Sequence, residues 1–137
     1  MAWVAAGVAL GGGAEAIAQG LHGYNTYGIP GLIDIPSARV RPDGALGFNI
    51  SHFRNQTRNT LTFQVAPRLS GSFRYSQLYD IRSGFAAGTG TVRDFIFDRS
   101  FSLHYQLVEE TAARPAVAVG LNDFLGTGIY SSEYLVA

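Results

Sequence analysis

Two aspartates, Asp94 and Asp98, flank the apolar triplet Phe-Ile-Phe in this chain of 137 residues. Enzymes that cleave glycosidic bonds use two carboxyl groups, one as the acid and one as the base or nucleophile, so this spacing raises a carbohydrate-active enzyme as a hypothesis. Acidic side chains in loops and at strand ends more commonly face solvent or cap a turn. We therefore assign no catalytic residue and expect a protein that is not an enzyme.

The other residue types offer little to a metal or a cofactor. His22, His52 and His104 share no metal-ligand spacing, and the sequence contains no cysteine. The glycine-rich segments 88–91 and 126–128 lack the lysine of a phosphate-binding loop, and the chain has no lysine at all. We predict no metal and no cofactor. Because the formal net charge is zero, we also predict no nucleic-acid partner.

A row of polar side chains is the stronger candidate for a binding surface. Every second residue along parts of the sequence carries a hydroxyl, amide, imidazole or guanidinium group. The row consists of Thr60, Thr62, Gln64, Ser70, Ser72, Arg74, Ser102, His104 and Gln106. Neutral groups of this kind form hydrogen bonds with sugars and do not retain them as a strong charge would. We hypothesise that these residues line a shared polar interior.

Alternation of apolar and polar residues predicts the strands that would position this row. Apolar residues occupy the row opposite the polar one, for example Leu61, Phe63 and Phe73. The stretches with this pattern are Ala45–Phe53, Arg58–Ala66, Leu69–Tyr79, Asp98–Glu109, Pro115–Asp123 and, less cleanly, Ile129–Ala137. No segment after residue 20 has the period of a helix. The sequence therefore predicts an all-β fold.

Hairpin register follows from matching apolar with apolar residues, because a slip of one residue turns every side chain to the wrong face. The expected pairs of the first hairpin are Phe53 with Arg58, Ile50 with Leu61, Phe48 with Phe63 and Leu46 with Val65. In the second, Val65 pairs with Leu69, Leu61 with Phe73, Thr62 with Ser72 and Gln64 with Ser70. In the third, Glu109 pairs with Pro115, Leu107 with Val117, Tyr105 with Val119 and Leu103 with Leu121.

The alternation leaves two interpretations open, a membrane barrel and a soluble sandwich or barrel. Strands of about 9 to 11 residues cross a bilayer when tilted, and the polar rows are small and uncharged as in a barrel lumen. We favour an antiparallel up-and-down meander that forms part of an outer-membrane β-barrel. Its five or six strands are fewer than the eight of the smallest membrane barrels. We therefore expect a barrel that this chain does not complete.

The chain divides into three regions by composition. Residues 1–18 are apolar and end in Ala-Ile-Ala, which predicts a signal peptide, although its basic start is missing. Residues 19–44 form a lead-in segment rich in glycine and proline, interpreted either as a plug or as an introductory strand with turns. Residues 45–137 form the barrel segment, and the connection 80–97 is its predicted external loop.

Several motifs resemble the N-terminal region of the YjbH family of exopolysaccharide-associated outer-membrane proteins. In order they are YGIPGLIDIPSARVRPDGALGFNISHF, NTLTFQVAPRLSGSFRYS, FDRSFSLHYQL and PAVAVGLNDFLGTGIYSSEYLVA, and they extend from Tyr27 to the last residue. The resemblance implies an outer-membrane β-barrel of a Gram-negative bacterium that takes part in producing or exporting an extracellular polysaccharide. Many members are described as lipoproteins, whereas this sequence has no cysteine to carry a lipid.

These observations combine into one leading expectation and two alternatives. The leading one is a non-catalytic outer-membrane component of exopolysaccharide biosynthesis or export, whose partners are the lipid bilayer, the exopolysaccharide and other secretion components. A soluble periplasmic β-sandwich or lipocalin-like carbohydrate-binding module is the first alternative. The second is the enzyme that the aspartate pair would imply.

Overall fold

The computed structural model describes residues 23–79 and 95–137, and every regular element within them is a β-strand. A small sheet contains two of the strands, β1 (Gly31–Leu32) and β2 (Ile35–Pro36). The main sheet contains β3 (Leu46–Phe53), β4 (Gln56–Ala66), β5 (Leu69–Tyr79), β6 (Phe95–Val108), β7 (Val117–Gly126) and β8 (Ser132–Val136). In the described part of the chain, no helix is long and apolar enough to cross a membrane.

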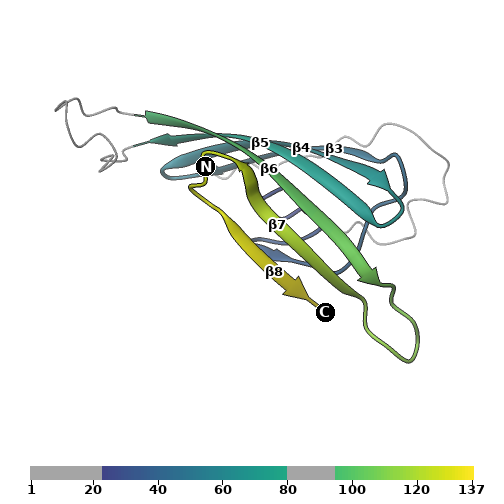
Figure 1. Cartoon of the computed structure of the whole chain (residues 1–137). Helices are drawn as coiled ribbons and strands as arrows, with labels where there is room; N and C mark the ends of the chain where they lie inside the picture. Colours follow the sequence, from purple (N-terminus) through teal and green to yellow (C-terminus); the bar gives the residue numbers. More distant parts are fainter. Residues whose placement is uncertain (1–22, 80–94) are drawn as a thin grey trace.

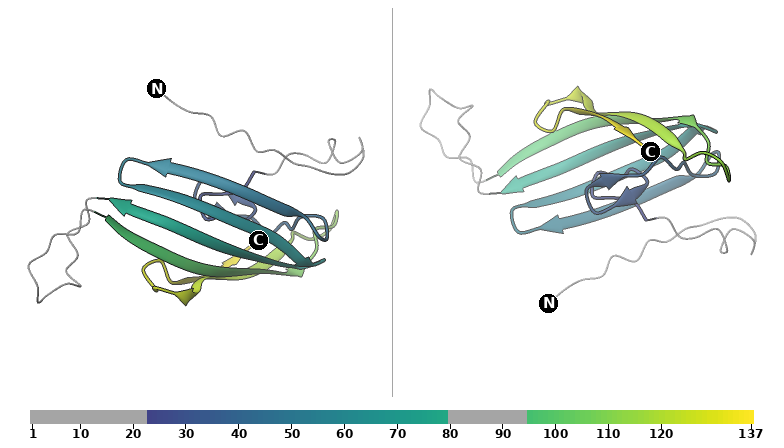
Figure 2. Two further views of the ribbon diagram at one scale, coloured as in Figure 1. Left: turned by 90° about the horizontal axis from the view of Figure 1, so that it is seen from above. Right: turned by 90° about the horizontal axis from the view of Figure 1, so that it is seen from below.

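The six strands of the main sheet lie in chain order, and each pairs antiparallel with its neighbour (Figure 1). This arrangement confirms the predicted antiparallel meander. Figure 2 shows that the sheet curls from β3 to β8 and that the β1–β2 hairpin lies on the inner side of the curve. Among the described strands, β3 and β8 form the two edges and do not pair with each other, so the sheet is not closed.

The second hairpin has the predicted register along most of its length. Leu61 pairs with Phe73, and Thr62 pairs with Ser72. The predicted pair of Val65 with Leu69 is wrong, because a bulge makes Ala66 the partner of Leu69. The third hairpin likewise has its predicted register at its centre, where Leu103 pairs with Leu121 and Tyr105 with Val119. Its predicted pair of Leu107 with Val117 is wrong, since a second irregularity places Val108 opposite Val117.

The first hairpin differs from its prediction by two residues. Phe53 pairs with Gln56 and Phe48 pairs with Leu61, so the loop shortens from four residues to Arg54 and Asn55. Two-residue connections are the commonest hairpin turns because their twist matches that of the strands. A shift of two residues leaves every side chain on its predicted face. The β6 strand also begins at Phe95 instead of Asp98, so the predicted external loop is shorter than 80–97.

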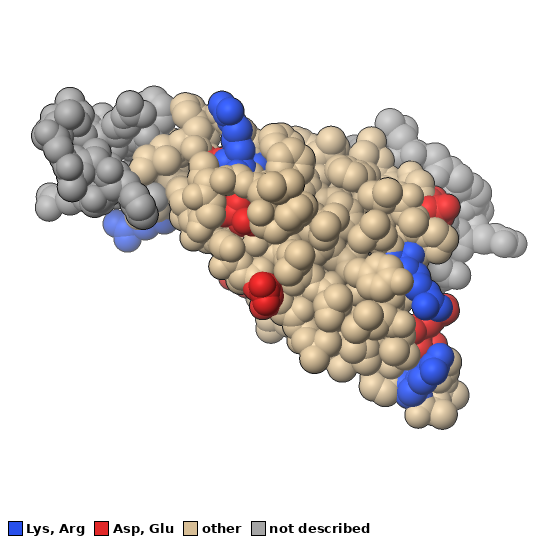
Figure 3. Space-filling model, viewed as in Figure 1, with Lys and Arg blue, Asp and Glu red and all other residues tan. Residues whose placement is uncertain are grey.

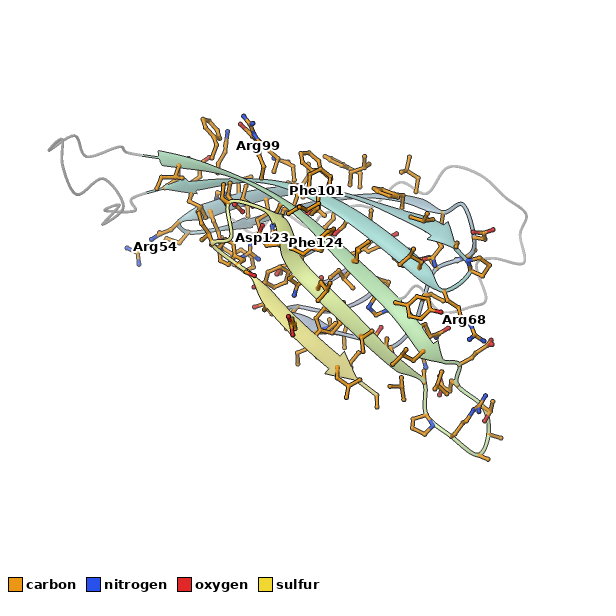
Figure 4. All side chains as sticks on the ribbon, viewed as in Figure 1. Arg54, Arg68, Arg99, Phe101, Asp123 and Phe124 are labelled. Atoms are coloured by element: carbon orange, nitrogen blue, oxygen red, sulfur yellow. The ribbon has the colours of Figure 1, made fainter. Side chains whose placement is uncertain are left out.

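The two faces of the main sheet have the reverse of the usual polarity. Its outer face carries exposed apolar side chains, such as Phe48 at 59% exposure, Leu61 at 39% and Leu125 at 59%. Its inner face, which faces the lead-in segment, carries polar side chains that are buried. Figure 3 shows the outer face as mostly uncharged, with charged atoms gathered toward its ends. Figure 4 places Arg54 and Arg68 at turns at opposite ends of the sheet.

Hydrophobic burial within the described residues is correspondingly small. The one apolar cluster that forms inside consists of Ala38, Ala116 and Ala118, with Val136 packed against it. A soluble domain of this size would bury its large apolar residues, because removing them from water is the dominant favourable term in folding. The predicted signal peptide, 1–18, lies outside the described residues, as does most of the predicted external loop.

Candidate functional site

All nine residues of the predicted polar row lie on the inner face of the main sheet, and none is more than 6% exposed. They come from the three central strands, β4, β5 and β6. Cross-strand pairing brings them into direct contact in ladders, for example Ser70 opposite both Gln64 and His104. The alternation of the strands therefore gathers the row into one continuous polar surface.

The same face carries further buried polar residues that were not assigned to the row. They are Arg58, Ser76, Asp98, Ser100 and Asp123, each at most 4% exposed. The first four continue the even-numbered alternation, so extending the pattern to the strand ends would have found them. Asp123 would not have been found this way. It lies at an irregular part of β7 with a positive φ of 50°, which turns an odd-numbered residue toward the inner face.

The lead-in segment lies against this polar face and contacts it through hydrogen bonds. Asn49 donates its amide to the Asn25 carbonyl at 3.1 Å. Gln106 donates to the carbonyl of Ala38 at 2.9 Å, and Thr62 donates to the carbonyl of Gly28. The contacts are polar on both sides, so the segment covers the row without forming a hydrophobic core with it.

A turn within the lead-in segment sets its path over the sheet. The side chain of Asn25 is buried and accepts hydrogen bonds from the backbone amides of Tyr27 and Ile29, both at 3.0 Å. Gly28 has a φ of 78°, a conformation that favours glycine. A Cβ atom at Gly28 would also collide with the side chain of Thr60. The turn therefore brings the backbone into close contact with β4.

Four ionisable side chains meet at one end of the polar face and are called here the charged cluster, which consists of Arg58, Arg74, Asp98 and Asp123. The Nη2 atom of Arg74 lies 3.9 Å from Oδ2 of Asp98, and both side chains are essentially inaccessible. Arg58 donates to the hydroxyl of Thr26 at 2.9 Å. Electrostatic interactions couple Arg74 to the other three members. The cluster therefore links β4, β5, β6 and β7.

Two tyrosine rings face the arginines of the charged cluster. The guanidinium carbon of Arg58 lies 4.7 Å from the ring centre of Tyr27 and 5.1 Å from that of Tyr130. The corresponding distances for Arg74 are 5.0 Å and 5.4 Å. Cation–π attraction at such distances stabilises a guanidinium group away from water. Tyr27 belongs to the lead-in segment and Tyr130 to the β7–β8 connection, so two distant parts of the chain complete this region.

The opposite end of the polar face has a different character. His104 and Tyr134 share a hydrogen bond of 2.8 Å between Nδ1 and the hydroxyl group, and their rings stack. The ring of Tyr134 lies directly over Gly120, where a Cβ atom would collide with it. Ser70 donates to Gln64 at 2.6 Å. Neutral, mutually bonded groups therefore occupy this end.

The acidic residues of the described ranges do not assemble into a metal site, since no three His, Cys, Asp or Glu side chains there could hold an ion. Asp98 accepts a hydrogen bond from the hydroxyl of Thr127 and faces Arg74. Its proposed catalytic partner, Asp94, lies outside the described residues.

Comparison with known proteins gives one family and one curated relative. A family described as "Exopolysaccharide biosynthesis protein YbjH" matches residues 23–137. The "Uncharacterized lipoprotein YjbH" of Escherichia coli (strain K12) is 33% identical over 115 residues, which cover 81% of this chain and 16% of the relative. The chain thus spans about a sixth of the length of that relative. No solved structure matches the chain.

Proposed function

Because this chain belongs to the YjbH family of exopolysaccharide biosynthesis proteins, we propose that it forms a membrane-embedded β-barrel section of an outer-membrane component that produces or exports an exopolysaccharide. In this proposal the outer face of the main sheet contacts lipid and the inner face contributes to a polar interior. The role is non-catalytic, so the polar row contacts the polysaccharide without cleaving it.

The reversed polarity of the sheet is the observation that carries the proposal. Large apolar side chains of the main sheet are exposed on one face, from Leu46 in β3 to Leu135 in β8. Contiguous apolar surface of this extent is rare on soluble monomers and is the expected lipid contact of a membrane barrel. A soluble carbohydrate-binding module would not explain this exposed apolar surface. The name of the relative from Escherichia coli includes "lipoprotein", which agrees with an envelope location.

Site-directed labelling tests the membrane location. The chain contains no cysteine, so single cysteines can carry a nitroxide label at Phe48 or Leu121 on the outer face and at Arg54 or Arg68 in the turns. In outer-membrane vesicles, we expect molecular oxygen to reach the outer-face labels and a water-soluble nickel chelate to reach the turn labels. Equal access of the nickel chelate to all four positions, or recovery of the protein in the soluble periplasm, would contradict the proposal.

Secretion of polysaccharide tests the role of the polar row. Gln106 lies on the inner face, and its strand neighbour Leu107 is 45% exposed on the outer face. We expect Gln106→Ala and Arg74→Ala to reduce secretion, and we expect Leu107→Ala, the matched control, to leave it unchanged. Unchanged secretion in both inner-face variants, at normal protein levels, would show that the polar row has only a structural role.

A further inference from the structure

The charged cluster has more hydrogen-bonding capacity than its protein neighbours use. None of the three side-chain nitrogens of Arg74 donates a hydrogen bond to another protein atom, although the residue is 1% exposed. One carboxylate oxygen of Asp98 and one of Asp123 likewise accept none. Buried polar groups in folded proteins are nearly always paired. This concentration of unused donors and acceptors therefore points to an additional polar partner.

The geometry of the cluster also differs from that of an ion pair that serves stability. Arg74 and Asp98 approach within 3.9 Å without forming a hydrogen bond. A buried ion pair offsets the cost of removing its charges from water only when its hydrogen bonds are well formed. Two arginines and two aspartates give a formal charge of zero. The cluster therefore has no net charge to attract an anion or a cation specifically.

We propose that the charged cluster is a binding site for an uncharged sugar unit with neighbouring hydroxyl groups. Each sugar hydroxyl both donates and accepts a hydrogen bond. A guanidinium group donates to hydroxyl oxygens, and a carboxylate accepts from hydroxyl protons. Arg74 and Asp98 lie side by side with unused groups of both kinds. The proposal rests on the proposed role in exopolysaccharide production and names a specific contact point for the polysaccharide.

The aromatic rings beside the cluster support a sugar ligand over water alone. The ring centres of Tyr27 and Tyr130 lie 6.5 Å apart, and the ring planes are nearly perpendicular. An aromatic ring presents an apolar surface with a polar tip, which suits the mixed apolar and polar faces of a sugar ring. Tyr130 lies in the connection between β7 and β8 and is only partly buried.

The site continues along the inner face through unpaired hydroxyl groups. The side-chain oxygens of Ser72, Ser76 and Ser100 are buried and form no hydrogen bond with other protein atoms. They flank Arg74 on β5 and β6. Hydroxyl groups can donate or accept by rotating. They are therefore suited to successive sugar units that leave the charged cluster.

Calorimetric titration of the purified full-length protein in detergent tests the site. The probes are uncharged tetrasaccharides of glucose, galactose and mannose, with tetragalacturonate as the charged comparison. We expect at least one uncharged probe to bind and the double variant Arg74→Met/Asp98→Leu to bind it at least tenfold more weakly. The matched control is Arg54→Met, at an exposed turn near the same end of the sheet, and its affinity should be unchanged.

Replacement of a buried ion pair by apolar residues of similar size is often neutral or stabilising, so the double variant should keep its circular dichroism spectrum. If it does not fold, Asp123→Asn provides the second test. Asparagine has the same shape and tolerates the φ of 50° at this position, and we expect it to weaken binding at least threefold.

Three results would overturn the proposal: no binding of any uncharged probe, binding of tetragalacturonate alone, or unchanged affinity in a folded variant of the cluster. The labelling experiment on the outer face does not involve these residues. If the labels report contact with lipid while the cluster variants bind normally, the sugar site is wrong and the membrane role stands. If the labels report water at every position, the membrane role itself fails.

Discussion

Replacement of Leu61 by arginine tests directly whether the outer face contacts lipid. Leu61 is the sixth of the 11 residues of β4 and is 39% exposed. Eleven residues extend about 36 Å along a strand, and a tilt of about 45° reduces this to about 26 Å across the membrane. That height matches the apolar band of a membrane barrel, about 25 Å. Leu61 would therefore lie close to the middle of the bilayer.

The expected cost follows from this depth. An arginine on the lipid face costs about 2–4 kcal/mol at the middle of the bilayer and about 0–1 kcal/mol near its surface. We expect Leu61→Arg to lower the free energy of unfolding by about 2–4 kcal/mol, the cost at the middle of the bilayer. Val65→Arg, on the outer face near the end of β4, should lower it by the smaller amount. On a water-exposed surface, both substitutions would change stability by less than about 0.5 kcal/mol.

Guanidinium unfolding of the full-length protein in phospholipid vesicles, followed by circular dichroism, measures both values. Leu61→Ala controls for the loss of the leucine side chain. The decisive quantity is the difference between the two arginine variants, because both introduce the same side chain on the same face. Equal effects of Leu61→Arg and Val65→Arg would refute the assignment of the outer face to lipid.

Two further predictions concern the cover of the polar face and its neutral end. Gly28→Ala should destabilise the lead-in segment by more than Gly44→Ala, because both glycines have a positive φ but only at Gly28 would a Cβ atom collide with Thr60. Amide hydrogen exchange of residues 23–41 should therefore become faster in the Gly28 variant alone. Equal exchange rates in the two variants would contradict the close contact. Tyr134→Phe should lower the free energy of unfolding by about 0.5–1.5 kcal/mol, because it removes the hydrogen bond to His104. An unchanged free energy of unfolding would show that this bond contributes nothing to stability.

The strand pattern was readable from the sequence because the alternation of side chains is a property of the extended backbone itself. Leu61 and Thr62 point to opposite faces in any strand that contains both. The Pro67 turn is short, so the pairing of Leu61 with Phe73 followed from the same rule. The nine residues of the polar row therefore share a face as a consequence of this alternation.

The rule of matching faces does not distinguish registers that differ by two residues. Phe48 meets an apolar residue whether it pairs with Phe63, as predicted, or with Leu61, as observed. The geometry of the turn at Arg54 and Asn55 decides between them. The rule also fails at bulges, because an extra residue interrupts the alternation locally. Asp123 is the clearest case, because its positive φ moves it to the inner face.

The sequence by itself determined which side chains share a face and that one face is apolar and the other polar, because these properties depend only on neighbouring residues. Tertiary structure alone decided that the lead-in segment covers the polar face and that Tyr27 and Tyr130 meet at Arg74. These residues are far apart in the chain, and no local pattern relates them. Their meeting depends on how the chain returns across the curved sheet, and that return places the two rings beside the charged cluster.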